Sequence, residues 1–192
     1  MKKTTLLTFI TTIVIGSTAM TQIQKGNVLL GGNLANINLG LNDPKIFSVD
    51  LTPKAAWFIK DNVALGGYVN FGLETAKGSS TTTSYGIGAL GRYYTGPEGE
   101  LIKHGRFFGE ITAGFGGVNV SGADTTNGLN LSAGPGFAYF ITPNIGLEAL
   151  LKYNSLVGFG STDYQSNLNF SFGFQIYLPG HSTANKVKRD IE

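Results

Sequence analysis

Seven ionisable side chains are the residues of this sequence best placed to do chemistry. They lie in segments that alternate between apolar and polar side chains, on the polar face, which otherwise carries little charge. Arg92 and Glu110 lie at similar depth in neighbouring segments, with Lys54 and Glu148 near that level. A charge in a crowded interior of low dielectric constant must be paired or hydrogen-bonded. We therefore expect a polar network, either a plug of ion pairs or the gate of a narrow solute path, formed by Asp50, Lys54, Glu74, Arg92, Glu110, Glu148 and Lys152.

Metal and nucleotide chemistry find little support in the sequence. The chain has no cysteine, and three acids in the expected connections, Asp43, Asp124 and Asp163, are isolated from one another. The stretch GIGALG at 86–91 matches G-x-G-x-x-G, but a dinucleotide site needs a helix directly after it, and RYYTGPEGE follows instead. We expect these glycines to lie on the wall of a sheet, and we expect no cofactor and no metal.

The segments that position the charged residues alternate between apolar and polar side chains. The stretch NLNFSFGFQIYL at 167–178 does so without a miss, which is typical of a β-strand with two different faces. Alternation blurs only around Asn33–Ile37. Eight such strands are expected, at 26–39, 45–59, 63–74, 84–95, 106–120, 128–141, 145–155 and 165–178. Most of them reach the 9–11 residues or so that a strand needs to cross a bilayer.

The two faces differ in a way that decides which one points outward. Only 14% of the residues are charged, against roughly 25% in soluble domains, and the polar face is rich in small side chains that suit the narrow interior of an eight-stranded barrel. The apolar face carries aromatic residues near both strand ends, which flank an aliphatic band in the manner of a membrane barrel. These expected aromatic girdles are Trp57, Tyr93, Phe107 and Tyr139 at one end and Phe47, Phe71, Tyr85 and Tyr153 at the other.

The N-terminus predicts export. Residues 1–19 combine two lysines, an apolar run and a small-residue cleavage site after Ala19, which is the layout of a signal peptide. A membrane anchor is the alternative, but the run is short and is broken by threonines. The predicted domains are the signal peptide at 1–19, a barrel at 23–178 and a polar tail at 179–192. A net charge of +2 gives no reason to expect a nucleic-acid partner.

The stretches AWFIKDNVALGGY, YFITPNIGLEALLKY and SFGFQIYL, together with the eight alternating segments, resemble the small outer-membrane β-barrel family of OmpA/OmpX type. The resemblance implies an all-β, eight-stranded antiparallel up-and-down transmembrane barrel in a Gram-negative-type outer membrane. It implies contact with outer-membrane lipid and lipopolysaccharide, insertion by the barrel-assembly machinery, and a monomer. The resemblance also implies an assembly signal in the last strand, formed by Phe172, Phe174, Ile176, Tyr177 and Leu178. Family members often end on that strand, whereas this chain continues with PGHSTANKVKRDIE.

The function expected from this architecture is structural or envelope-interacting, with little permeation. A narrow porin-like channel for ions or small solutes is the alternative, and a soluble ligand-binding barrel is a more distant one. Enzymes of this family place a histidine at the outer rim, whereas His104 and His181 both fall on the expected periplasmic side, the latter in the periplasmic tail. We therefore do not expect an enzyme.

Overall fold

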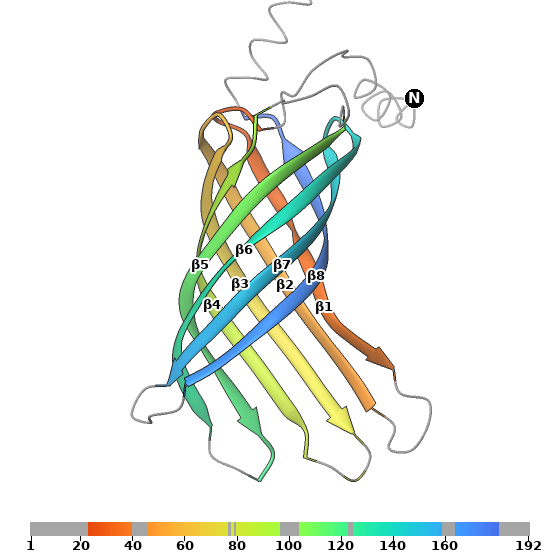
Figure 1. Cartoon of the computed structure of the whole chain (residues 1–192), viewed down its shortest axis with the longest axis vertical. Coiled ribbons are helices and arrows are strands. Elements are labelled where there is room, and N and C mark those ends of the chain that lie inside the picture. The colour runs from red at the N-terminus through yellow and green to blue at the C-terminus, as the bar shows by residue number, and fades with distance from the viewer. Residues whose placement is uncertain are drawn as a thin grey trace, which may run out of the picture.

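The computed structural model describes residues 23–39, 46–76, 78, 80–96, 104–122, 125–158 and 164–180. Within these ranges the chain forms one closed barrel in which each strand pairs antiparallel with the next and β8 pairs with β1 (Figure 1). The strands are β1 (Val28–Leu39), β2 (Ile46–Lys60), β3 (Val63–Ala76), β4 (Thr82–Tyr94), β5 (Gly105–Val120), β6 (Thr126–Thr142), β7 (Ile145–Gly158) and β8 (Tyr164–Leu178). The predicted fold class and strand order are confirmed.

Strand boundaries lie within three residues of those predicted. The largest difference is in β7, which continues to Gly158 rather than ending at 155. Asn154 and Leu156 extend the inward face of this strand, and Val157 extends its exposed face. In β1 the register against β2 shifts between Ala35 and Asn38. A bulge of this kind changes which residues share a face, and it lies where the alternation of the sequence blurs.

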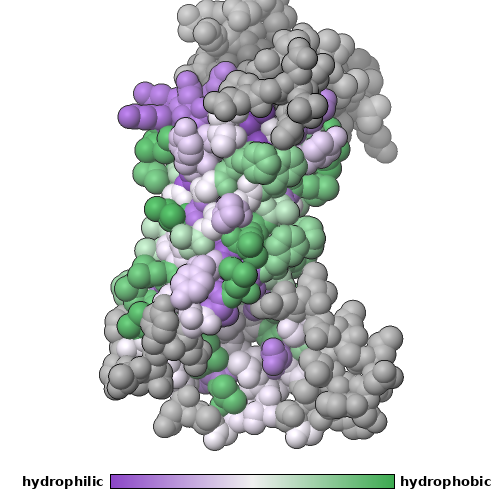
Figure 2. Space-filling view, in the orientation of Figure 1, coloured by the Kyte–Doolittle hydropathy of each residue, from purple (hydrophilic) through white to green (hydrophobic). Residues whose placement is uncertain are grey.

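Large apolar side chains cover the outside of the barrel. Exposed aliphatic and aromatic residues occur on every strand, and Figure 2 shows them as a band around the middle of the molecule, with hydrophilic side chains above it. In the centre of β5, Ile111 is 64% exposed. All eight residues of the two expected aromatic girdles are exposed on this outer surface. The predicted division into inward and outward faces is therefore confirmed.

The two ends of the barrel differ. Tight turns join β2 to β3 and β6 to β7 at the upper end of Figure 1, and longer connections lie at the lower end. Asn62 in the first turn has a φ of 65°, a left-handed conformation that asparagine tolerates better than most residues. The ladder that closes the barrel runs from Val28 to Ala35 against Leu178 to Ser171. Next to it, the backbone N–H of Gly180 donates to Asn27 Oδ1 at 3.1 Å.

The expected signal peptide at 1–19 and most of the expected tail at 179–192 lie outside the described residues. No helix in the described part of the chain is long and apolar enough to span a membrane.

Candidate functional site in the barrel lumen

Arg92 and Glu110 form the centre of a buried ion-pair cluster. The β4–β5 register places them directly opposite one another on the inner face. Arg92 Nε donates to Glu110 Oε2 at 3.0 Å and Nη2 donates to the same oxygen at 2.5 Å. Only 2% of Arg92 and 1% of Glu110 is exposed. A pair this deeply desolvated is maintained only because its hydrogen bonds are made.

Glu148 on β7 joins Arg92 from across the lumen. Arg92 Nη1 donates to both carboxylate oxygens of Glu148, at 2.8 and 3.0 Å. The hydroxyl of Tyr177 on β8 donates to Glu148 Oε1 at 2.8 Å, and Arg92 Nη1 also donates to the hydroxyl of Tyr94 at 2.8 Å. The guanidinium therefore links three strands, β4, β5 and β7, through one planar group whose fork of donors suits this geometry, and Tyr177 joins β8 to it through Glu148.

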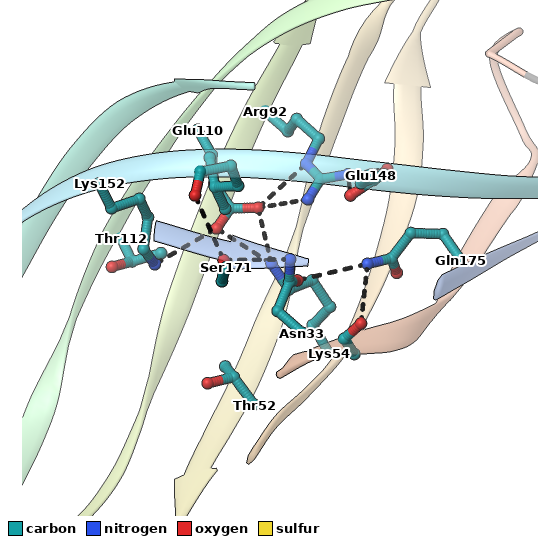
Figure 3. A network of polar contacts seen from close by, with 12 residues as sticks. Asn33, Thr52, Lys54, Arg92, Glu110, Thr112, Glu148, Lys152, Ser171 and Gln175 are labelled. Carbon is teal, nitrogen blue, oxygen red and sulfur yellow. Dashed lines mark hydrogen bonds and ion pairs between the residues drawn. The ribbon is translucent and has the colours of Figure 1, made fainter. Parts of the chain in front are cut away.

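Two lysines complete the cluster on its other side. Lys54 Nζ on β2 donates to both oxygens of Glu110, at 3.1 and 2.9 Å. Lys152 Nζ on β7 lies farther from Glu110, at 3.4 Å from Oε1, and its side chain is 16% exposed. Figure 3 shows Lys54, Arg92 and Lys152 approaching Glu110 from different parts of the barrel wall.

The remaining two predicted network residues lie apart from the cluster. Asp50 on β2 is half-buried and lies nearer the long connections, where its Oδ1 and the hydroxyl of Ser84 converge over Gly72. Glu74 is exposed near the end of β3, opposite Ser48 and Thr82 in the two ladders. The structure thus brings five of the seven predicted residues together and leaves Asp50 and Glu74 outside.

An aromatic layer that was not predicted from the sequence lies beside the cluster on the side of the short turns. Its members are the buried residues Phe58, Tyr94, Phe108 and Tyr177. The Phe108 ring lies 4.2 Å from the Arg92 guanidinium carbon, a cation–π distance, and the Tyr94 and Tyr177 hydroxyls lie 2.9 Å apart. What the sequence does show is their position, because each of these residues occupies an inward-facing position in the alternation of its strand.

Arg106 is a second residue that the sequence reasoning missed. It precedes Phe108 on the inward phase of β5 and is buried at the short-turn end. Its Nη1 donates to the carbonyl oxygen of Gly105 at 2.7 Å. Its place on the same phase as Glu110 was the signal available.

On the other side of the cluster, the lumen widens into a cavity of about 210 Å³. Lys54, Thr112, Leu150 and Lys152 lie at its inner end, and Asp50, Ser84, Asn130 and Asn167 line the part nearer the long connections. Most of the remaining wall consists of amide and hydroxyl side chains. The cavity therefore offers many neutral hydrogen-bonding groups and a charged inner end.

The charged groups of the cluster are engaged in ion pairs with one another. His104 is exposed at the short-turn end with its ring centroid 6.4 Å from that of Tyr139, far along β5 and β6 from the cavity. Within the described ranges, no group of three or more His, Asp or Glu side chains is arranged to hold a metal ion.

Comparison with solved structures finds the same architecture. Neisserial surface protein A matches with a TM-score of 0.53 and 20% identity, over 78% of this chain and 95% of that one. The N-terminal β-barrel domain of Pseudomonas aeruginosa OprF matches with a TM-score of 0.53 and 14% identity, over 80% and 98%. The attachment invasion locus protein Ail of Yersinia pestis matches with a TM-score of 0.50 and 14% identity, over 80% and 99%. The fold is that of a small outer-membrane β-barrel.

The likeness is one of fold, because every identity is low. No protein-family model matches the chain, and no curated protein sequence matches it. What the three solved barrels share with this chain is therefore the closed eight-stranded wall.

Proposed function

We propose that this protein is an exported, monomeric barrel of the outer membrane with a structural or envelope-interacting role and little permeation. The observation that carries the proposal is the pair of side-chain layers that fills the middle of the lumen. Arg92, Glu110 and Glu148 are almost completely buried across the centre of the barrel, and the aromatic layer lies directly next to them. Eight strands leave an interior that side chains fill, so these two layers close the path along the axis.

The outer surface supports insertion in a membrane. An exposed band of large apolar side chains on every strand is what a lipid-facing wall requires, and closure leaves the sheet without the free edges that lipid cannot satisfy. In this proposal the girdle residues contact the lipid and lipopolysaccharide interfaces. The last strand, with Phe172, Phe174, Ile176 and Leu178 exposed and Tyr177 buried, serves as the assembly signal.

Bilayer recording tests the closed state. We expect the purified wild-type barrel to show little steady conductance, and we expect Arg92→Ala to introduce a small leak, because the cluster is one of the two layers that close the axis. A large and stable wild-type conductance would instead establish the narrow channel. Membrane fractionation with heat-modifiable gel mobility tests the location, and recovery as a soluble periplasmic protein would contradict it.

A narrow channel is the second candidate, and the cavity is the observation that favours it. The cavity already extends from the cluster toward the long connections. Within the described residues, the cluster, the aromatic layer and the buried side chains of Arg106 and Ile23 lie between the cavity and the short-turn end, so these side chains would have to move to complete a path.

A further inference from the structure

The ion-pair cluster contains more positive than negative charge. Three cations, Lys54, Arg92 and Lys152, meet two carboxylates, Glu110 and Glu148, among the side chains joined in the described structure. An uncompensated cation in a lumen of low dielectric constant is costly, and a nearby anion removes that cost. The cluster as it stands is one negative charge short.

Lys152 is the cation where an additional anion would bind. Its Nζ is the most distant of the three from Glu110, and its side chain is 16% exposed while those of Lys54 and Arg92 are buried. An ammonium group has three donors, and the contact with Glu110 at 3.4 Å is a long one for any of them. The ammonium group of Lys152 therefore faces the cavity as well as the cluster.

The cavity has the size and lining that a small anion needs. Its volume of about 210 Å³ equals the share of roughly seven liquid water molecules. Lys54 and Lys152 both line its inner end, and hydroxyl and amide groups surround them. Those nearest the lysines along the strands are Asn33, Thr112, Ser132, Asn169 and Ser171.

Asp50 restricts the charge of the ligand. It lines the same cavity but lies four residues from Lys54 on β2, which corresponds to about 13 Å along a strand. The cavity therefore has two ammonium groups at its inner end and a carboxylate nearer the long connections. A compact group with one negative charge fits this pattern, whereas an extended polyanion would bring a second charge close to Asp50.

We propose that the lumenal cavity is a binding site for a small oxyanion, a carboxylate or a phosphate group, held by Lys152 with Lys54 beside it. This site goes beyond the proposed function, because it requires neither conduction nor closure of the barrel. The anion can come from a free solute that enters between the long connections. It can also be the headgroup of an amphiphile, because the ladder with β1 ends at Ser171 while β8 continues to Tyr164, and Asn167 and Asn169 of that continuation line the cavity.

The test measures binding of acetate and of inorganic phosphate to the full chain in discs of zwitterionic phosphatidylcholine, at constant ionic strength, by calorimetry. We expect saturable binding with one site. Lys152→Gln should weaken it about 10-fold or more, the loss expected for a charge-assisted hydrogen bond, and Lys152→Arg should stay within about 3-fold of wild type. Lys60→Gln is the matched control, because Lys60 is exposed at the short-turn end, and it should leave the affinity unchanged.

A second variant keeps the test decisive if Lys152→Gln does not fold, as judged by heat-modifiable mobility. Asn169→Asp places a negative charge on the cavity wall and should also weaken binding about 10-fold, by charge repulsion. The absence of saturable wild-type binding, or equal losses in Lys152→Gln and Lys60→Gln, would overturn the proposal. Adding anionic phosphatidylglycerol to the discs distinguishes the sources: competition with acetate identifies a lipid headgroup, and unchanged acetate affinity identifies a free solute.

Discussion

Arg92 on β4 and Glu110 on β5 are register partners whose side chains join at 2.5 Å between Nη2 and Oε2. The pair is asymmetric. Glu110 also forms ion pairs with Lys54 and Lys152, whereas Arg92 is the cation that pairs with Glu148 in the described structure. Loss of Arg92 therefore leaves Glu148 without its cation, and loss of Glu110 leaves two ammonium groups without their carboxylate.

A double-mutant cycle measures this coupling. Arg92→Ala should lower the free energy of unfolding by about 3–5 kcal/mol, because it leaves the buried carboxylate of Glu148 without its cation. Water in the lumen would reduce this cost. Glu110→Ala should also destabilise, and the double variant should recover part of the summed loss. Urea unfolding in lipid vesicles, followed by the fluorescence of the single tryptophan, Trp57, gives these values. Strict additivity would show that the two residues act independently.

The two lysines on Glu110 should differ in their importance for stability. Lys54 lies 2.9 Å from Glu110 Oε2 and is buried, while Lys152 lies 3.4 Å from Oε1 and is partly exposed. Lys54→Met should therefore cost about 1–3 kcal/mol, the range for hydrogen bonds to charged groups, and Lys152→Met under about 1 kcal/mol. The same unfolding assay ranks them, and a larger loss for Lys152→Met would contradict the geometry.

Arginine substitutions on the outer face should report depth in the membrane. Ile111 lies near the middle of β5, so Ile111→Arg should cost roughly 2–4 kcal/mol. Leu147 lies near the short-turn end of β7, so Leu147→Arg should cost only about 0–1 kcal/mol. Asn169→Leu, on the inner face, serves as the control and should assemble normally. Equal costs at Ile111 and Leu147 would argue against a membrane-spanning band.

Glycine at position 114 should be required for packing of the lumen. A Cβ at Gly114 would collide with Ile87 O and the Cα of Gly88, and would lie 2.8 Å from the Tyr68 hydroxyl oxygen. Gly114→Ala should therefore cost about 1–3 kcal/mol through overpacking. At Gly109 a Cβ would meet nothing within 4 Å, so Gly109→Ala should be neutral in the same assay. A neutral Gly114→Ala would show that the β4–β5 ladder can move apart locally.

Labelling of single cysteines tests the orientation, and the absence of native cysteine makes the experiment clean. Thr125 lies at the end of the barrel that carries the long connections, so Thr125→Cys should react with an impermeant maleimide on intact cells. Pro143→Cys lies in an exposed short turn at the opposite end and should react only after the outer membrane is permeabilised. The reverse pattern would invert the barrel.

The strands, and the assignment of their inward and outward faces, were predictable because the alternation of polar and apolar side chains can be seen directly in the sequence. Arg92 and Glu110 could be brought to similar depth by counting from the turn between them, and the ladder places them opposite one another. The exposure of Glu74 was not predictable, because inward phase alone does not say how near a residue lies to the open end of the barrel.

The aromatic layer escaped prediction for a related reason. The contacts among Phe58, Tyr94 and Tyr177 depend on the relative stagger of β2, β4 and β8. Stagger is set by closure of the whole barrel, which no single segment encodes. The glycines of GIGALG show the same dependence: Gly88 leaves room for the ring of Tyr68 from the adjacent strand.

The hydrogen bond between Asn27 and Gly180 has a consequence for chain connectivity. Because this contact sits beside the closing β1–β8 ladder, the two ends of the barrel segment are neighbours in space. A short flexible linker from 180 to 27 would turn the wall into a covalent ring, and new ends could then be cut in any long connection, such as the one around 123. Such a circular permutant keeps every ladder, so the native order of the strands is one of several chain connectivities that are compatible with the same closed barrel.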